Sequence, residues 1–227
     1  MFWFGGPGTI FVLIAFVFAM YAQHQVSTAY SRYARIGNSR GLTGGELARE
    51  LLQSRGVSDV EVEPIRGRLT DHYDPRIKRV RLSEENYYGD SLAALGIAAH
   101  ETGHAMQHQE AYVPLALRNA IVPVAQFGST LAWPLFIFGF LLGAPSLADL
   151  GILLFLGAVV FQILTLPVEF NASQRAVAML SGGTYLSAQE IKPVQAVLRA
   201  AALTYVAAAA VAIAQLLRLL LIRNSRD

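Results

Sequence analysis

SLAALGIAAHETGHAMQHQ, residues 91–109, is the stretch of this sequence that decides the fold. Its alanine-rich first half is typical of a helix with a buried face. On a helix, His100 and His104 lie on one face, about 6 Å apart along the axis, so both imidazoles can reach one tetrahedral zinc ion. Glu101 then lies beside the first histidine, where its carboxylate can take a proton from a zinc-activated water. The His-Glu-x-x-His pattern therefore predicts a helix that carries a metal site.

The alternative is that His100 and His104 are ordinary packing residues without a metal. Two histidines four positions apart, with a carboxylate between them, are hard to explain by packing alone. A charged Glu101 on a helix lined by alanine, isoleucine and leucine would be costly to bury without a metal or another partner. We therefore favour the metal site.

A catalytic zinc site needs a third protein ligand and an open position. His108 shares the face of His104, but it lies about 12 Å along the axis from His100, too far to complete the same site on an unbroken helix. We expect His108 to be a supporting or surface residue. Glu169 is a better candidate, because it follows a long apolar block in LPVEFNASQRA. An ionisable residue at the end of a segment apolar enough to enter a membrane is a functional candidate. The alternative is an interfacial carboxylate paired with Arg175.

Composition places the chain in a membrane. Of its 227 residues 54% are hydrophobic and 15% are charged, and the apolar residues gather in blocks. The chain has no cysteine, so its metal ligands must be histidines and carboxylates. The net charge of +2 comes without a dense basic stripe, which argues against a nucleic-acid partner.

Four apolar blocks approach the roughly 20 residues that a membrane-spanning helix needs. They cover residues 2–22, 121–142, 147–168 and 196–217. We interpret the first as a retained anchor and the middle two, 121–168, as a transmembrane hairpin. The expected fold is mainly α, a multi-pass membrane protein with three to four transmembrane helices and a small α+β catalytic domain.

The polar stretch 26–118 carries 12 of the 18 lysines and arginines and should therefore face the cytoplasm. The N-terminus would then lie outside, and segment 169–193, with Glu169, would return to the cytoplasmic side. Arg218, Arg223 and Arg226 follow the last block and argue against a final crossing, so the side of the C-terminus stays open.

Local patterns predict the elements of this polar domain. LTGGELARELLQSRG, residues 42–56, is typical of a helix whose N-terminus is capped by Thr43 and Glu46. VEVEPI, residues 60–65, and RVRLS, residues 79–83, alternate like strands. The connection between them is rich in turn formers, so we expect the two strands to form a hairpin.

The sequence also resembles a known family. A His-Glu-x-x-His helix, a transmembrane hairpin and then EFNAS resemble the membrane gluzincins, which include the CAAX prenyl proteases and the HtpX-type peptidases. LTDHYDP, VRLSE, SLAALGIAAHETGHAMQH and PVEFNAS are similar to the YugP-type membrane zinc metallopeptidases of bacteria, and this resemblance covers about residues 43–175. It implies one zinc ion held by His100, His104 and Glu169, with Glu101 as the catalytic residue.

The chain departs from the wider gluzincin pattern at Ser173. The gluzincins place at this position an aspartate that orients a zinc-bound histidine, and such partners tune metal affinity. Ser173 or Asn171 takes over that role, or the orientation comes from Asp71 or Asp74. The residues leave this choice open.

Three further residues are candidates for stabilising an oxyanion or supporting the site. In zincins a histidine or tyrosine beside the active helix often steadies the tetrahedral intermediate, and His72 or Tyr73 could do so. The alternative for the Thr70-to-Pro75 stretch is a tight turn fixed by aspartate and proline. Arg175 is the third candidate, with a salt bridge or a phospholipid contact as its alternative.

The sequence therefore predicts a membrane-embedded zinc endopeptidase of the bacterial inner membrane, with a protein or peptide substrate and its catalytic domain facing the cytoplasm. The motif specifies metal-dependent hydrolysis but not the substrate, so a hydrolase of lipid amides is an alternative. A catalytically silent scaffold stabilised by zinc is another, although Glu101 would then have no purpose.

Overall fold

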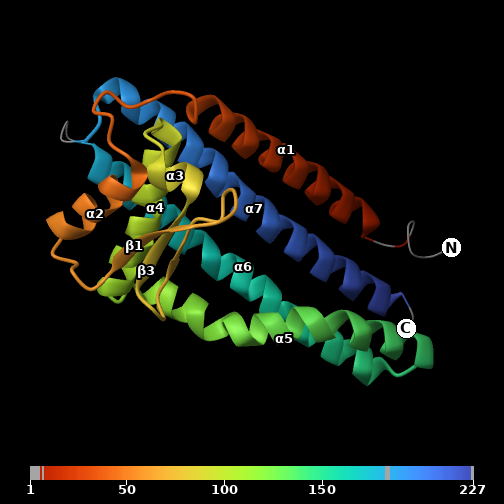
Figure 1. The fold of residues 1–227 in the computed structure, drawn as a ribbon. Helices are drawn as coiled ribbons and strands as arrows, with labels where there is room; N and C mark the ends of the chain where they lie inside the picture. The colour runs from red at the N-terminus through yellow and green to blue at the C-terminus, as the bar shows by residue number, and fades with distance from the viewer. Residues whose placement is uncertain (1–5, 7, 182–184, 226–227) are drawn as a thin grey trace. The chain divides into compact units, whose positions relative to one another are not determined.

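The computed structural model describes residues 6, 8–181 and 185–225 and is mainly helical (Figure 1). Residues 2–5 and 7 of the first predicted block, and residues 182–184 of the predicted segment 169–193, lie outside this part. In chain order the elements are α1 (Thr9–Tyr33), α2 (Gly44–Ser54), β1 (Glu61–Ile65), β2 (His72–Asp74), β3 (Arg79–Ser83), α3 (Glu84–Tyr88), α4 (Leu92–Gln109), α5 (Val113–Leu142), α6 (Pro145–Leu180) and α7 (Ala188–Asn224).

The chain forms two compact units. The first, the apolar unit, comprises residues 1–23, 114–167 and 203–227. The second, the polar unit, comprises residues 24–113 and 168–202. Helices α1, α6 and α7 each contribute to both units, because they are longer than the apolar blocks in the sequence.

Four helices, α1, α5, α6 and α7, are long and apolar enough to cross a membrane. Many of their large apolar side chains are exposed; Phe16, Phe127 and Leu153, for example, are each more than half exposed. Lipid tails are the natural cover for such surfaces. Where α5 and α6 pack together, glycines stand at the contacts, as at Gly139 against the backbone of Ala148. The expected multi-pass helical membrane fold is confirmed.

The polar unit is built around α4. The capping box predicted for α2 is confirmed: Thr43 Oγ1 accepts from the backbone N–H of Glu46, whose carboxylate accepts in return from the backbone N–H of Thr43. Ser91 caps α4: its side-chain oxygen accepts from the backbone N–H of Ala94 at 3.1 Å. The core of the unit lies among α2, α4, β3 and the parts of α6 and α7 that belong to it. Its buried side chains include Leu47, Leu51, Val80, Leu82, Leu95, Leu180 and Val194.

The predicted hairpin of residues 60–65 and 79–83 is wrong. β1 and β3 are neighbours, but they run parallel, with Val62 opposite Val80. The turn-rich connection contains a further short strand, β2, which pairs antiparallel with β3 and places Tyr73 opposite Val80. The sheet order is β1-β3-β2. The tight turn therefore joins β2 to β3. The connection from β1 to β2 passes from one edge of the sheet to the other, because β3 lies between these two strands.

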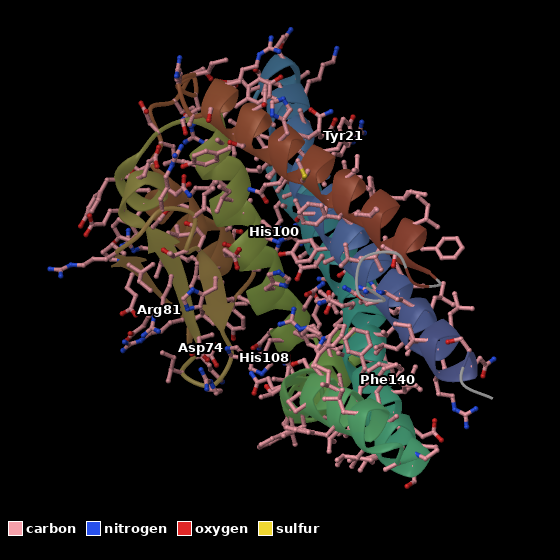
Figure 2. All side chains as sticks on the ribbon, turned by 90° about the vertical axis from the view of Figure 1, so that its right-hand side faces the viewer. Tyr21, Asp74, Arg81, His100, His108 and Phe140 are labelled. Atoms are coloured by element: carbon pink, nitrogen blue, oxygen red, sulfur yellow. The ribbon has the colours of Figure 1, made fainter. Side chains whose placement is uncertain are left out.

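Sheet pleating divides the residues of β2 between two faces. Tyr73 shares the inner face with Val80 and packs against the core. His72 lies opposite Arg81 and Asp74 opposite Arg79, on the outer face, where Arg79 and Arg81 also pair with Glu63. Figure 2 shows Asp74 and Arg81 on the strands beside α4.

Candidate metal centre

Three potential ligand side chains converge from two helices of the polar unit. His100 and His104 lie one turn apart on α4, with ring centroids separated by 4.8 Å, and Glu169 comes from α6. Glu169 Oε2 lies 3.3 Å from His100 Nε2 and 3.5 Å from His104 Nε2. Within the described residues, these three form the group of histidines and acidic residues whose geometry suits a metal ion.

The three side chains fit zinc. Tetrahedral ligands at about 2.0–2.1 Å from zinc are spaced about 3.3 Å apart, close to the distances between Glu169 and the two histidines. Two imidazoles and one carboxylate also form one of the usual sets of three protein ligands in catalytic zinc sites. Glu169 is only 4% exposed, and a carboxylate so deeply buried calls for a compensating positive charge.

Glycine at position 103 allows α4 and α6 to meet closely at this point. A Cβ atom on Gly103 would lie only 2.8 Å from the carbonyl oxygen of Ala172 and 3.3 Å from its Cα. Any larger residue would therefore push against the α6 backbone, which has no freedom to rotate away. The close approach brings Glu169 on α6 within reach of His100 and His104.

Glu101 is buried beside the two histidines, with 8% of its surface exposed. Burial raises the pKa of its carboxyl group, while His100 and His104 act in the opposite direction and Glu169 adds to the rise. The pKa of His104 is also raised: burial would lower it, but the hydrogen bond with Glu169 and the charge of Glu101 outweigh burial. The pocket therefore favours positive charge, which agrees with a cation site.

Both imidazoles turn their Nε2 atoms toward Glu169 and are held at their Nδ1 atoms. Ser173 Oγ lies 3.2 Å from His100 Nδ1, and Gln107 Oε1 lies 3.0 Å from His104 Nδ1. Of the residues considered for orienting a histidine, Ser173 therefore contacts one directly. Gln107 was not foreseen from the sequence.

Asn171 and Arg175 lie one step further from the histidines. Gln107 donates to Asn171 Oδ1 at 2.9 Å, and Arg175 Nε donates to the same oxygen at 2.7 Å. The Arg175 guanidinium also forms two 2.8 Å hydrogen bonds with the Glu110 carboxylate. This pairing lowers the pKa of Glu110. Arg175 is thus paired with Glu110, whereas Glu169 faces the histidines.

The two aspartates considered for orienting a histidine are hydrogen-bonded to other residues. Asp71 accepts hydrogen bonds from the backbone and hydroxyl of Ser83 and from Asn86, and Asp74 pairs with Arg76. These two aspartates therefore hold loop and strand in place.

Tyr73 and His108 are hydrogen-bonded to each other, whereas His72 contacts the backbone of Thr70. Tyr73 Oη lies 2.8 Å from His108 Nδ1, and burial together with Asp59 and Asp74 raises the pKa of Tyr73 to about 12. Figure 2 shows His108 near the end of α4, beyond His100. His72 contacts the backbone oxygen of Thr70 at 2.8 Å.

Comparisons with known proteins identify the family of this chain. The family described as "Putative neutral zinc metallopeptidase" matches residues 8–224. The "Putative membrane protease YugP" of Bacillus subtilis (strain 168) is 50% identical over 220 residues, which cover 96% of this chain and 98% of that protein. No solved structure matches the chain. Because the family match runs almost from end to end, the chain belongs to the "Putative neutral zinc metallopeptidase" family.

Proposed function

We propose that this membrane-embedded protein is a zinc-dependent endopeptidase in which His100, His104 and Glu169 bind one zinc ion and Glu101 is the general base. The observation that carries the proposal is the convergence of three ligand atoms, all within 4.8 Å of one another, beside a second buried carboxyl group, that of Glu101. The family supports zinc and peptidase activity. A purely structural zinc site would have no use for Glu101.

The residues divide the reaction between them. Zinc, when bound, supplies a Lewis acid that activates water and polarises the peptide carbonyl. Glu101 takes a proton from the attacking water and passes it to the leaving amine. Burial raises the pKa of Glu101, which makes its carboxylate a stronger base toward the attacking water. His100 and His104 keep neutral Nε2 atoms available, and Glu169 supplies the negative charge.

Zinc content and peptide cleavage together test this assignment. The purified chain in detergent should contain about one zinc ion, as expected for three ligands at a single site, and should cleave an unfolded protein. Glu101→Gln should keep the zinc and lose cleavage, whereas Glu169→Ala should lose both. Glu50 on α2 is exposed, so Glu50→Gln and Glu50→Ala are matched controls that should change neither property.

Each failure has its own meaning. A wild-type chain without zinc would refute the metal centre. Zinc binding with unchanged cleavage in Glu101→Gln would refute the general base. Zinc binding without any peptide cleavage would direct the search to lipid amides as substrates or to a silent scaffold.

We further propose that the polar unit faces the cytoplasm of a bacterial cell, since it contains most of the basic residues outside the apolar helices. The chain has no cysteine, so single substitutions can report the side of the membrane. In intact cells, Ser58→Cys in the exposed part of the polar unit should resist a membrane-impermeant maleimide and react after lysis. Labelling of Ser58→Cys in intact cells would contradict this proposal and place the polar unit on the outer side of the membrane. Ser225→Cys reports the side of the C-terminus in the same assay.

A further inference from the structure

Gln107 lies at the centre of a buried hydrogen-bond network between α4 and α6. Its side chain has no exposed surface, and all three of its hydrogen bonds go to protein atoms: His104 Nδ1, the Val168 carbonyl oxygen and Asn171 Oδ1. Val168 directly precedes Glu169 in α6. One amide group therefore contacts both the second histidine and the turn that carries the carboxylate.

The orientation of the Gln107 amide follows from its partners. A backbone carbonyl oxygen can only accept, so the Gln107 atom 2.8 Å from the Val168 oxygen must be the donor Nε2. The Arg175 guanidinium can only donate, so Asn171 must turn its oxygen toward Arg175 Nε, and that oxygen also accepts from Gln107. Both contacts require that the remaining atom, Oε1, faces His104.

The orientation of Gln107 in turn fixes the tautomer of His104. Because Oε1 is an acceptor, the hydrogen of the neutral His104 ring must be on Nδ1, 3.0 Å away. The lone pair is then on Nε2, which faces Glu169. His100 has no such constraint, because the Ser173 hydroxyl near its Nδ1 can either donate or accept.

We propose that Gln107 is a positioning residue of the metal centre, which fixes the tautomer and ring orientation of His104 and joins α4 to the Glu169 turn of α6. The inference rests on the proposed function, because it takes His104 and Glu169 to be zinc ligands. Histidine ligands of zinc are commonly held through their other nitrogen, and loss of such a partner typically weakens metal binding by about 10- to 100-fold.

Zinc affinity of the full-length chain in detergent, measured by competition with a chromogenic chelator, tests this role. Gln107→Met keeps the size of the side chain but removes all three hydrogen bonds of the side-chain amide, and it should raise the Kd for zinc by about 10- to 100-fold. Gln109, two residues further on, is exposed, so Gln109→Met is the matched control and should bind zinc like the wild type.

A third variant separates positioning from a merely structural role. Gln107→Glu keeps an oxygen acceptor for His104 Nδ1 but gives up donors to Val168 and Asn171. If Gln107 acts through His104, the Glu variant retains more zinc affinity than the Met variant. If Gln107 only joins the two helices, Gln107→Glu binds zinc no more tightly than Gln107→Met. The visible spectrum of the Co²⁺-loaded chain gives a second readout, which should change in Gln107→Met and stay unchanged in Gln109→Met.

The outcomes are distinct. A Kd of Gln107→Met within twofold of Gln109→Met, or a Glu variant that binds zinc no better than the Met variant, overturns this inference while the proposed function stands. If Gln107→Met does not fold, Gln107→Glu decides alone: near wild-type binding supports the role, and binding as weak as in His104→Ala overturns it. A wild-type chain that binds no zinc overturns both proposals.

Discussion

Replacing Gly103 with alanine tests whether the close contact of α4 and α6 holds the metal centre together. The new Cβ would lie 2.8 Å from the Ala172 carbonyl oxygen, whereas carbon and oxygen atoms in close contact are normally at least about 3.3 Å apart. The helices must therefore separate by about 0.5 Å, which exceeds the tolerance of about 0.2 Å in ligand distances at a metal site. Glu169 would then lie too far from the two histidines.

The energetic cost follows from two opposing effects. Overpacking against a rigid backbone costs about 1–3 kcal/mol, while alanine in place of glycine favours the helix by up to about 1 kcal/mol. With the full gain of about 1 kcal/mol the net destabilisation is about 0–2 kcal/mol, which lowers the melting temperature by up to roughly 8 °C for a chain of this size. If about 1.4 kcal/mol of that strain is incurred when the helices close around zinc, the Kd rises about tenfold.

Gly96→Ala is the matched control on the same helix. Its new Cβ would lie 3.1 Å from a methyl group of Val194, a side chain that can adjust, so we expect unchanged zinc affinity and a melting temperature equal to or above that of the wild type. Chelator competition and thermal unfolding in detergent measure both quantities. Equal zinc affinities in Gly103→Ala and Gly96→Ala would refute the argument.

Three further changes probe the polar unit away from the metal. Thr43→Ala removes the capping box of α2 and should cost about 1 kcal/mol, lowering the melting temperature without changing zinc content. Asp71→Ala leaves the buried hydroxyl and N–H of Ser83 without their acceptor and should cost about 1–3 kcal/mol; an unchanged melting temperature would argue against this bond network. The pairing with Arg175 lowers the pKa of Glu110 in the folded state, so its contribution to stability is complete above the unfolded pKa and disappears as pH falls through the folded pKa. Melting curves of wild type and Glu110→Gln should therefore converge at acid pH, and a constant gap would contradict this.

Local sequence patterns predicted the helices well, because each rests on neighbouring residues. The apolar blocks give four long helices, and Thr43 begins α2 as its N-cap residue. The same patterns failed at the sheet. A three-residue strand such as β2 is too short to show alternation, and the parallel pairing of β1 with β3 depends on residues far apart in the chain.

Only part of the candidate site could be predicted from the sequence, for the same reason. The spacing of His100 and His104 is local, so it can be read directly. Glu169, 65 residues beyond the second histidine, was a candidate because it follows an apolar block, and the resemblance implied it as a ligand; the structure brings its carboxylate to the ring of His104. Gln107 escaped notice because a polar residue near a helix end usually faces solvent, and one of its partners is a backbone oxygen, which no sequence pattern displays.

Gly103 and Gln107 lie one helical turn apart on α4 and both contact the backbone of α6. This kind of contact explains why no matching sequence pattern appears on α6. Each contacts α6 through backbone atoms: Gly103 packs against Ala172, and Gln107 donates to the Val168 carbonyl oxygen. Any residue with a standard helical backbone offers these contacts, so α6 needs no special side chain opposite them. At these two contacts the requirement falls on α4, which must be small at one position and carry an amide at the other. We therefore expect substitutions on α4 to disturb the metal centre more than conservative changes at Val168 or Ala172 do.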